Sequence, residues 1–261
     1  MIRQVDPQQD LEELFAALEP PPWRFGNHRS ATEDPENAQF VTMELDKCVA
    51  KGVMREWDPA WGPPKVVNGI WVVVTDDGKG GKKYRLCINP MYINLFMRYR
   101  RVRYEQLKDV PNWVGPDDYL YTTDDKSGYW HVPLHPSMYP YLVVEWKGRY
   151  LYWAMLPFGV APACHLYTEL KTEKYRAPRA MGVRMGMLID DQLGAAQGQQ
   201  RAVLQCRAIV TLQAALGSTI GYKGKCQLWP RRRATFLGME VDAERQAFVV
   251  PDRKVTALAA Q

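Results

Sequence analysis

The chain has 261 residues, of which 46% are hydrophobic and 24% charged, so it can bury a core in one large domain or two closely packed subdomains. Its net charge of +5 is compatible with a polyanionic partner and with many enzymes that have none. The five cysteines are odd in number and contain no C-x-x-C pair, which argues against a disulfide framework and a structural zinc site. No apolar run approaches a membrane span, and we expect a soluble protein of the cytoplasm or nucleus with no membrane partner.

The N-terminal part alternates short helical patterns with loops. Residues 6–18 predict an amphipathic helix that stops at three consecutive prolines, residues 20–22. The polar stretch 23–35 predicts a loop, and residues 40–50 predict a second helix that ends at Gly52.

A hairpin follows, with β-branched residues 70–75 as one strand and residues 84–88 as the other. Its tip carries Lys79, Lys82 and Lys83. The Gly-Lys-Gly-Gly run lacks the spacing of a phosphate-binding P-loop. The tip is therefore either a basic hairpin that contacts phosphates or an ordinary solvated turn.

Two basic clusters and a histidine pair leave alternatives open. Arginines at 98–103, interleaved with tyrosines, and at 231–233 suit a nucleic-acid backbone and its bases, although a solvated surface is the usual role of such runs. His131 and His135 have a spacing that would form a zinc pair on a helix. Pro133 between them predicts an extended segment and ordinary polar histidines.

Two pairs of adjacent carboxylates follow β-rich runs, one after residues 119–123 and one after residues 185–189. The pairs are Asp124 with Asp125 and Asp190 with Asp191. The second pattern predicts strand, tight turn and strand, with the carboxylates at the tip. Neighbouring anions repel, so each pair is either screened by solvent or compensated by a divalent cation. If the strand ends meet, they form a hard-oxygen site for two Mg²⁺ ions, which suits nucleotidyl transfer.

The remaining pattern consists of a hairpin over residues 142–153, a Gly/Pro-rich loop from 156, and helices at 163–176 and 197–216. The second helix has Val203, Cys206 and Val210 as its apolar stripe and Gly217 as its stop. Residues 235–242 with 248–250 predict a last hairpin.

The order of these motifs from Phe40 to Lys254 resembles the fingers and palm of reverse transcriptases, particularly those of tyrosine-recombinase (DIRS-like) retrotransposons. The resemblance implies an α+β fold of right-hand polymerase fingers and palm, with an antiparallel palm sheet backed by helices and a largely absent thumb. It divides the chain into an N-terminal extension (1–36), fingers with part of the palm (37–118), palm with a fingers insertion (119–254) and the start of a truncated thumb (255–261).

The palm motifs of this resemblance imply the catalytic residues. Asp124 falls at the metal-binding position of the first palm motif, and Leu188-Ile-Asp-Asp corresponds to the Y-x-D-D turn. Gly224-Lys-Cys matches the fourth motif, which would place Lys225 near the leaving pyrophosphate. The implied ligands of two Mg²⁺ ions, with Mn²⁺ as a substitute, are Asp124, Asp190 and Asp191.

Other motifs imply the substrate contacts. Residues 83–94 look like the fingers motif, residues 156–163 are similar to the template- and nucleotide-contacting motif, and Phe236-Leu-Gly resembles the primer-gripping hairpin. The aromatic residue of the first palm motif would lie under the sugar of the incoming nucleotide. The implied nucleotide-binding residues are Lys83, Arg85, Tyr129, Phe158 and Gly159, and the implied primer grip is Phe236, Leu237 and Gly238.

The chain departs from the family pattern without losing a metal ligand. Leu188 replaces the usual aromatic before the Asp pair, Asn89 and Met91 stand where the family often has Asp and Arg, and Asp125 fills a position that is usually apolar.

The resemblance implies primer-dependent DNA synthesis from dNTPs on an RNA or DNA template. An RNA-dependent RNA polymerase shares the palm but normally has Asp at the position of Tyr129. A catalytically silent remnant of a retroelement that binds nucleic acid is the other alternative. The sequence does not address the oligomeric state.

Overall fold

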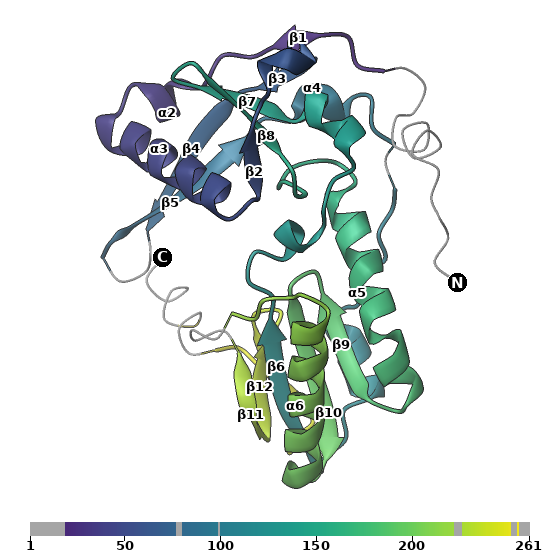
Figure 1. Cartoon of the computed structure of the whole chain (residues 1–261). Coiled ribbons are helices and arrows are strands. Elements are labelled where there is room, and N and C mark those ends of the chain that lie inside the picture. The colour runs from purple at the N-terminus through teal and green to yellow at the C-terminus, as the bar shows by residue number, and fades with distance from the viewer. Residues whose placement is uncertain (1–18, 77–79, 99, 222–225, 252–254, 256–261) are drawn as a thin grey trace. The chain divides into compact units, whose positions relative to one another are not determined.

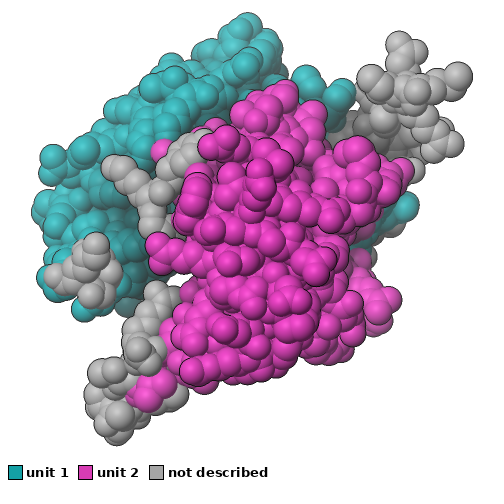
Figure 2. All heavy atoms as spheres, turned by 90° about the horizontal axis from the view of Figure 1, so that it is seen from below, with its two compact units in different colours: residues 1–100, 129–163 teal, residues 101–128, 164–261 magenta. Residues whose placement is uncertain are grey.

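The chain folds into two units and passes from one to the other after residues 100, 128 and 163. One unit comprises residues 1–100 and 129–163, and the other comprises residues 101–128 and 164–261 (Figure 2). These limits do not coincide with the predicted segments 37–118 and 119–254. The computed structural model describes residues 19–76, 80–98, 100–221, 226–251 and 255, so the predicted helix at 6–18 lies outside the described residues.

A mixed five-stranded sheet of order β1-β3-β7-β8-β2 forms the centre of the first unit. Its strands are β1 (Trp23–Arg24), β2 (Met54–Glu56), β3 (Val66–Asn68), β7 (Val143–Trp146) and β8 (Arg149–Trp153). The predicted hairpin at 142–153 is confirmed as β7 and β8. The loop predicted at 23–35 is wrong in part, because β1 pairs there with β3, a partner that is distant in the sequence.

Strands β4 (Ile70–Asp76) and β5 (Lys82–Ile88) pair as an antiparallel hairpin, which confirms the predicted one. Helix α3 (Pro35–Ala50) packs against this hairpin. The helix begins earlier than predicted because Asp34 caps it by accepting hydrogen bonds from two backbone amides, and Pro35 suits the first helical position. The unit also contains α2 (Arg29–Thr32), α4 (Met91–Asn94) and the 3₁₀ segments η1 (Pro59–Trp61), η3 (Gly128–His131, which begins at the unit boundary) and η4 (Pro136–Tyr141). Between the last two, Pro133 forms a β-bridge with Met155, so the extended segment predicted there is confirmed.

The second unit contains an antiparallel sheet of order β11-β6-β10-β9 with helices on one face (Figure 1). Its strands are β6 (Asp118–Asp124), β9 (Arg184–Leu188), β10 (Asp191–Gln197) and β11 (Gln227–Arg231). The helices are α5 (Ala163–Ala180) and α6 (Gln199–Ala215), and η2 (Leu107–Asn112) precedes β6. The antiparallel sheet backed by helices is therefore as predicted, although α5 extends past the predicted end at 176.

The predicted last hairpin is instead a three-stranded sheet of β12 (Arg233–Phe236), β13 (Met239–Asp242) and β14 (Ala247–Val249). Leu237 and Gly238 both have positive φ, of 49° and 77°, and they form a two-residue turn within the run that was predicted as one strand. Turns of this kind match the twist of the strands that they join.

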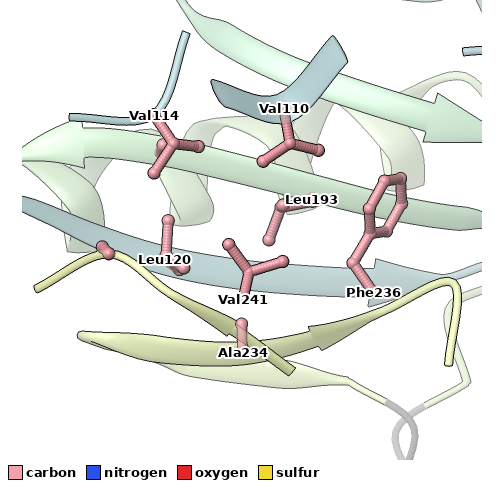
Figure 3. Packing of buried hydrophobic residues seen from close by; sticks show 9 residues of the cluster. Val110, Val114, Leu120, Leu193, Ala234, Phe236 and Val241 are labelled. Carbon is pink, nitrogen blue, oxygen red and sulfur yellow. The ribbon is translucent and has the colours of Figure 1, made fainter. Parts of the chain in front are cut away.

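The face of the sheet opposite the helices packs against β12 and β13 (Figure 3). Leu120 of β6 and Leu193 of β10 are fully buried there, in contact with a cluster that includes Phe236 and Val241. Strand residues alternate between faces, so the residues of β6 and β10 that do not join this cluster turn toward the helices.

Helix α6 presents to the sheet a stripe that differs from the prediction. Its buried residues are Ala202, Cys206, Ile209 and Gln213, and of the predicted stripe only Cys206 is among them. Gly198 and Gly217, with φ of 78° and 76°, flank the helix, and Gly217 is the predicted stop. No helix in the described ranges has both the length and the apolar character to cross a membrane.

Truncating the core between the two sheets of the second unit should destabilise it strongly. We expect Leu193→Ala to lower the free energy of unfolding by about 2–5 kcal/mol, because it removes a fully buried side chain and leaves a cavity. Urea unfolding measures the change. The matched control is Leu204→Ala on the outer side of α6, where the side chain is 61% exposed. Equal losses for both variants would contradict the packing described here.

Candidate active site

The chain positions of the predicted carboxylates come together where β6 ends and the β9–β10 hairpin turns. Asp191 is the direct antiparallel partner of Asp124, so the two side chains project from the same face of the sheet. Asp190 precedes Asp191 in the turn, and its carbonyl accepts a hydrogen bond of 3.2 Å from the backbone N–H of Asp125. The two strand ends therefore lie side by side, which is the condition on which the predicted metal site depends.

The hairpin turn itself contains an unusual residue. Leu188 pairs with Asp191, so Ile189 and Asp190 form the two-residue turn, and Asp191 is already the first residue of β10. Ile189 has φ of 50°, a conformation that β-branched residues rarely adopt, and it costs about 1–3 kcal/mol in such cases. The surrounding structure must therefore hold this turn in place.

Asp124 is only 4% exposed, and its backbone contacts Gly221 and Cys226. Its backbone N–H donates to the Cys226 thiol sulfur at 3.2 Å, and its carbonyl accepts from the Gly221 N–H at 2.8 Å. A Cβ atom at residue 221 would lie 2.8 Å from a carboxylate oxygen of Asp124. Glycine is therefore needed at 221 for the chain to pass this close to the carboxylate.

Asp125 does not share the environment of Asp124. It lies on the helix-facing side, because side chains alternate along an extended strand, and it is 2% exposed. One carboxylate oxygen accepts from the Tyr167 hydroxyl and from the Lys171 ammonium, the latter at 2.6 Å. The other oxygen accepts from the side-chain amides of Gln213 at 3.2 Å and Gln192 at 3.4 Å. The idea of Asp124 and Asp125 as one carboxylate cluster is therefore wrong.

Burial and pairing act in opposite directions on this buried ion pair. Burial by itself would raise the pKa of Asp125, but the Lys171 charge and the hydrogen bonds from Lys171 and Tyr167 hold that pKa below its ordinary value. Burial lowers the pKa of Lys171 against the opposing effect of the Asp125 charge.

The donor set suits a hard cation, since carboxylate oxygens are the ligands that Mg²⁺ prefers. The strand register brings the three backbone positions Asp124, Asp190 and Asp191 together. Within the part of the chain that is described, however, no three His, Cys, Asp or Glu side chains are grouped so that they could hold a metal ion. Lys225, the remaining predicted catalytic residue, lies outside the described residues.

The predicted nucleotide-binding residues Tyr129, Phe158 and Gly159 lie together in the first unit. The Tyr129 ring is buried and its centroid is 4.8 Å from that of Phe158, whose side chain is 57% exposed. Asn94 holds the loop, since its side chain donates to the Gly159 carbonyl and accepts from the Ala161 N–H, each at 2.8 Å. Gly159 has φ of 91°, which favours glycine.

The two predicted fingers residues, Lys83 and Arg85, are both exposed on β5. They are two positions apart, so they share one face of the strand. The Arg85 guanidinium donates to the Thr75 hydroxyl across the hairpin at 3.0 Å. On the other face, Tyr84 packs against Phe40 of α3.

The predicted primer grip divides into a buried and a turn part. Phe236 is in the core of the second unit, whereas Leu237 and Gly238 form the β12–β13 turn.

Beside the β12–β13–β14 sheet an open hollow of about 400 Å³ is lined by residues that include Thr122, Cys226, Trp229 and Arg231. Thr122 precedes Asp124 by two positions on β6, so this hollow lies on the same face of the sheet as the Asp124 carboxylate.

No protein-family profile matches the sequence, and no curated protein sequence matches it. Solved structures do match. The foamy viral protease-reverse transcriptase in complex with an RNA/DNA hybrid superposes with a TM-score of 0.76 at 14% identity, over 98% of this chain and 31% of that one. Its dRH form with double-stranded DNA gives 0.75 at 17%, over 98% and 41%, and a further complex with double-stranded DNA gives 0.74 at 15%, over 94% and 47%.

The chain has a reverse-transcriptase fold. The predicted α+β arrangement of fingers and palm is confirmed by this likeness. The chain spans less than half the length of the solved chains that it matches. The association with tyrosine-recombinase retrotransposons stays a prediction.

Sequence reasoning missed several residues that contact the predicted ones within each unit. In the first unit Asn94 bonds to the loop at Gly159. In the second unit the missed residues around Asp124 and Asp125 are Lys171, Gln192, Gln213 and Gly221. The sequence did contain a pattern that points to Lys171. Tyr167, Lys171 and Tyr175 are four residues apart, which puts them on one face of a helix. A lysine buried between two aromatic residues on such a face needs a charged partner. Gln213 likewise continues the buried stripe of α6 as a polar residue.

Removing the lysine of the buried pair should be far more costly than removing its neighbour. Lys171→Met leaves Asp125 as an unpaired buried charge, and we expect the free energy of unfolding to fall by about 3–5 kcal/mol. The matched control is Lys174→Met on the same helix, where the ammonium bonds to the Ser218 hydroxyl at 2.5 Å. Urea unfolding of both variants checks this, and a loss at Lys171 no larger than that at Lys174 would be the contrary result.

Proposed function

We propose that this chain catalyses template-directed, primer-dependent DNA synthesis by nucleotidyl transfer, as an RNA-directed DNA polymerase. The observation that carries the proposal is the register of β6 and β10, which places Asp124 opposite Asp191 and next to Asp190 on a reverse-transcriptase fold. Two further features set this place apart from an ordinary surface turn. Ile189 has a strained backbone conformation, and Gly221 packs against the Asp124 carboxylate.

In this mechanism Asp124 and Asp190 would hold two Mg²⁺ ions, with Asp191 in support. Bound there, the cations would neutralise charge at the reacting phosphate and would lower the pKa of the primer 3′-hydroxyl. Arg85 and Lys83, exposed on one face of β5, would bind the triphosphate oxygens. Tyr129 and Phe158 would form the apolar surface against the sugar, and the Asn94 bonds would fix the loop that carries Phe158 and Gly159. Lys225 would act near the leaving pyrophosphate.

The partners in this proposal are a primer paired with an RNA or DNA template and dNTPs. Its support is that three of the matching structures are complexes with an RNA/DNA hybrid or with double-stranded DNA. In the second unit, the hollow beside β11 offers the 59% exposed ring of Trp229, which suits stacking on a base, and Arg231, which suits a phosphate. The β12–β13 turn at Leu237 and Gly238 would contact the primer backbone.

A catalytically silent nucleic-acid-binding remnant of a retroelement is the second candidate. The observation that favours it is that no three side chains of the described residues stand ready as a metal-ligand group. Both candidates predict binding of a primer-template, so only the chemistry separates them.

Primer extension on an RNA template with Mg²⁺ and dNTPs tests the proposal. We expect the parent chain to extend the primer, and Asp124→Asn and Asp190→Asn to reduce extension below detection, because each removes a charge that the metal site requires. Asp117→Asn, at the opposite end of β6 on an exposed side chain, is the matched control and should extend like the parent. Binding of primer-template without extension by the parent would favour the silent remnant, and extension by either site variant at the parental rate would reject the assigned residues.

Tyr129 provides a test of which sugar the site accepts. An aromatic wall would exclude a 2′-hydroxyl sterically, so Tyr129→Val should increase rNTP incorporation relative to dNTP incorporation while dNTP use remains. Single-nucleotide incorporation assays measure the ratio, and thermal unfolding is recorded alongside because the ring is buried against Phe158. A variant that melts early but keeps the parental sugar preference would show a purely structural tyrosine, and a parent that prefers rNTPs would indicate an RNA polymerase.

A further inference from the structure

The buried ion pair of Asp125 and Lys171 has no task in the chemistry proposed above. Lys171 is 2% exposed and its ammonium lies over the rings of Tyr167 and Tyr175 as well as against the Asp125 carboxylate. Buried ion pairs contribute little net stability relative to apolar residues of similar volume. Stability alone therefore does not account for this pair.

The pair is connected to the site through the backbone. Asp125 directly follows Asp124, and its N–H donates to the carbonyl of Asp190. Gln192 directly follows Asp191, and its side-chain amide lies 3.4 Å from the Asp125 carboxylate and 3.5 Å from the Asp190 carbonyl. All three candidate metal ligands are thus adjacent in sequence to, or hydrogen-bonded by, residues of this network.

The network also has an anchor outside the strands. Gln192 accepts hydrogen bonds from the Thr123 and Tyr175 hydroxyls and from the Gln213 amide, so α5 and α6 both hold it. Ile189 keeps its unfavourable φ of 50° in the turn between these strands. Without fixed partners on the helix side, the turn could relax to a conformation of lower strain.

We propose that Lys171 is a positioning residue that, through Asp125, fixes the turn and strand end carrying Asp124, Asp190 and Asp191 for divalent-cation binding. This inference rests on the proposed function, since it names the residues that orient its metal ligands. Partners of metal ligands in the surrounding shell commonly set metal affinity by about 10–100-fold.

The charge of the pair gives a way to separate positioning from simple electrostatics. Loss of Lys171 alone would leave one more negative charge near the site, and electrostatics alone would then strengthen cation binding. Positioning predicts the opposite. The double variant Asp125→Asn/Lys171→Met removes both charges with almost no change in volume, so it leaves no unpaired buried charge and should fold with a melting temperature near that of the parent.

The experiment is a Mn²⁺ titration of the full chain followed by electron paramagnetic resonance, which counts free Mn²⁺ and does not depend on polymerase activity. Parent, Asp190→Asn, the double variant and Lys174→Met are compared, with melting temperatures for each. We expect Asp190→Asn to lose the site and the double variant to bind about 10-fold more weakly or worse at an unchanged melting temperature. Lys174→Met also removes one positive charge that acts on Asp125 but leaves the Asp125–Lys171 pair in place, so it is the electrostatic comparison and should bind Mn²⁺ at least as tightly as the parent.

The outcomes separate the two proposals. If the parent binds Mn²⁺, Asp190→Asn does not and the double variant binds like the parent, the positioning role is wrong and the metal site stands. If the parent does not bind Mn²⁺, or Asp190→Asn binds as the parent does, the proposed metal site fails and the positioning role with it.

If the double variant does not fold, Tyr167→Phe replaces it. This variant removes only the hydroxyl that donates to the same carboxylate oxygen, so parental affinity would overturn the inference and weakened affinity would support it.

Discussion

The antiparallel pairing of β6 with β10 is the constraint on which the arrangement of the second unit depends. Because side chains alternate along both strands, one register decides what each face of the sheet carries. Leu120, Leu193 and the carboxylates of Asp124 and Asp191 share one face, and Thr123, Asp125 and Gln192 share the other. A shift of β10 by one residue would turn Asp191 toward the helices and would bury Gln192 in the apolar core.

The two faces place opposite demands on their polar groups. On one face, carboxylates that are close together would stay ionised beside a cation. On the other, Asp125 is compensated permanently, by an ammonium and by hydrogen bonds from a hydroxyl and two amides. Hydrogen bonds inside such a buried polar network favour one geometry. The Gln213 side-chain oxygen is buried there without a hydrogen-bond partner among the described residues. The free-energy cost of burying the Asp125 network falls next to Asp124, Asp190 and Asp191, the residues whose geometry matters most for the proposed chemistry.

A likeness in fold at 14–17% identity indicates which physical features the architecture needs. An antiparallel sheet covered by two helices requires alternating strands, a buried stripe on each helix and turns of fixed length, and many sequences meet these demands. Asp125 illustrates the tolerance of the fold. A buried carboxylate is accommodated on the helix-facing side of the sheet because α5 supplies Lys171 and Tyr167 at the matching height.

The sequence by itself determined the local elements and the order of the motifs. The hairpins at 70–88 and 142–153, the end of α6 at Gly217 and the strand–turn–strand around Asp190 follow from periodicity and turn residues, which are local properties. Only the tertiary structure decided the short strand β1, the three-stranded end of the chain, the separation of Asp124 from Asp125 and the pairing of Asp125 with Lys171. These depend on contacts between residues far apart along the chain, and periodicity gives the face of a residue but not the partner that it meets there.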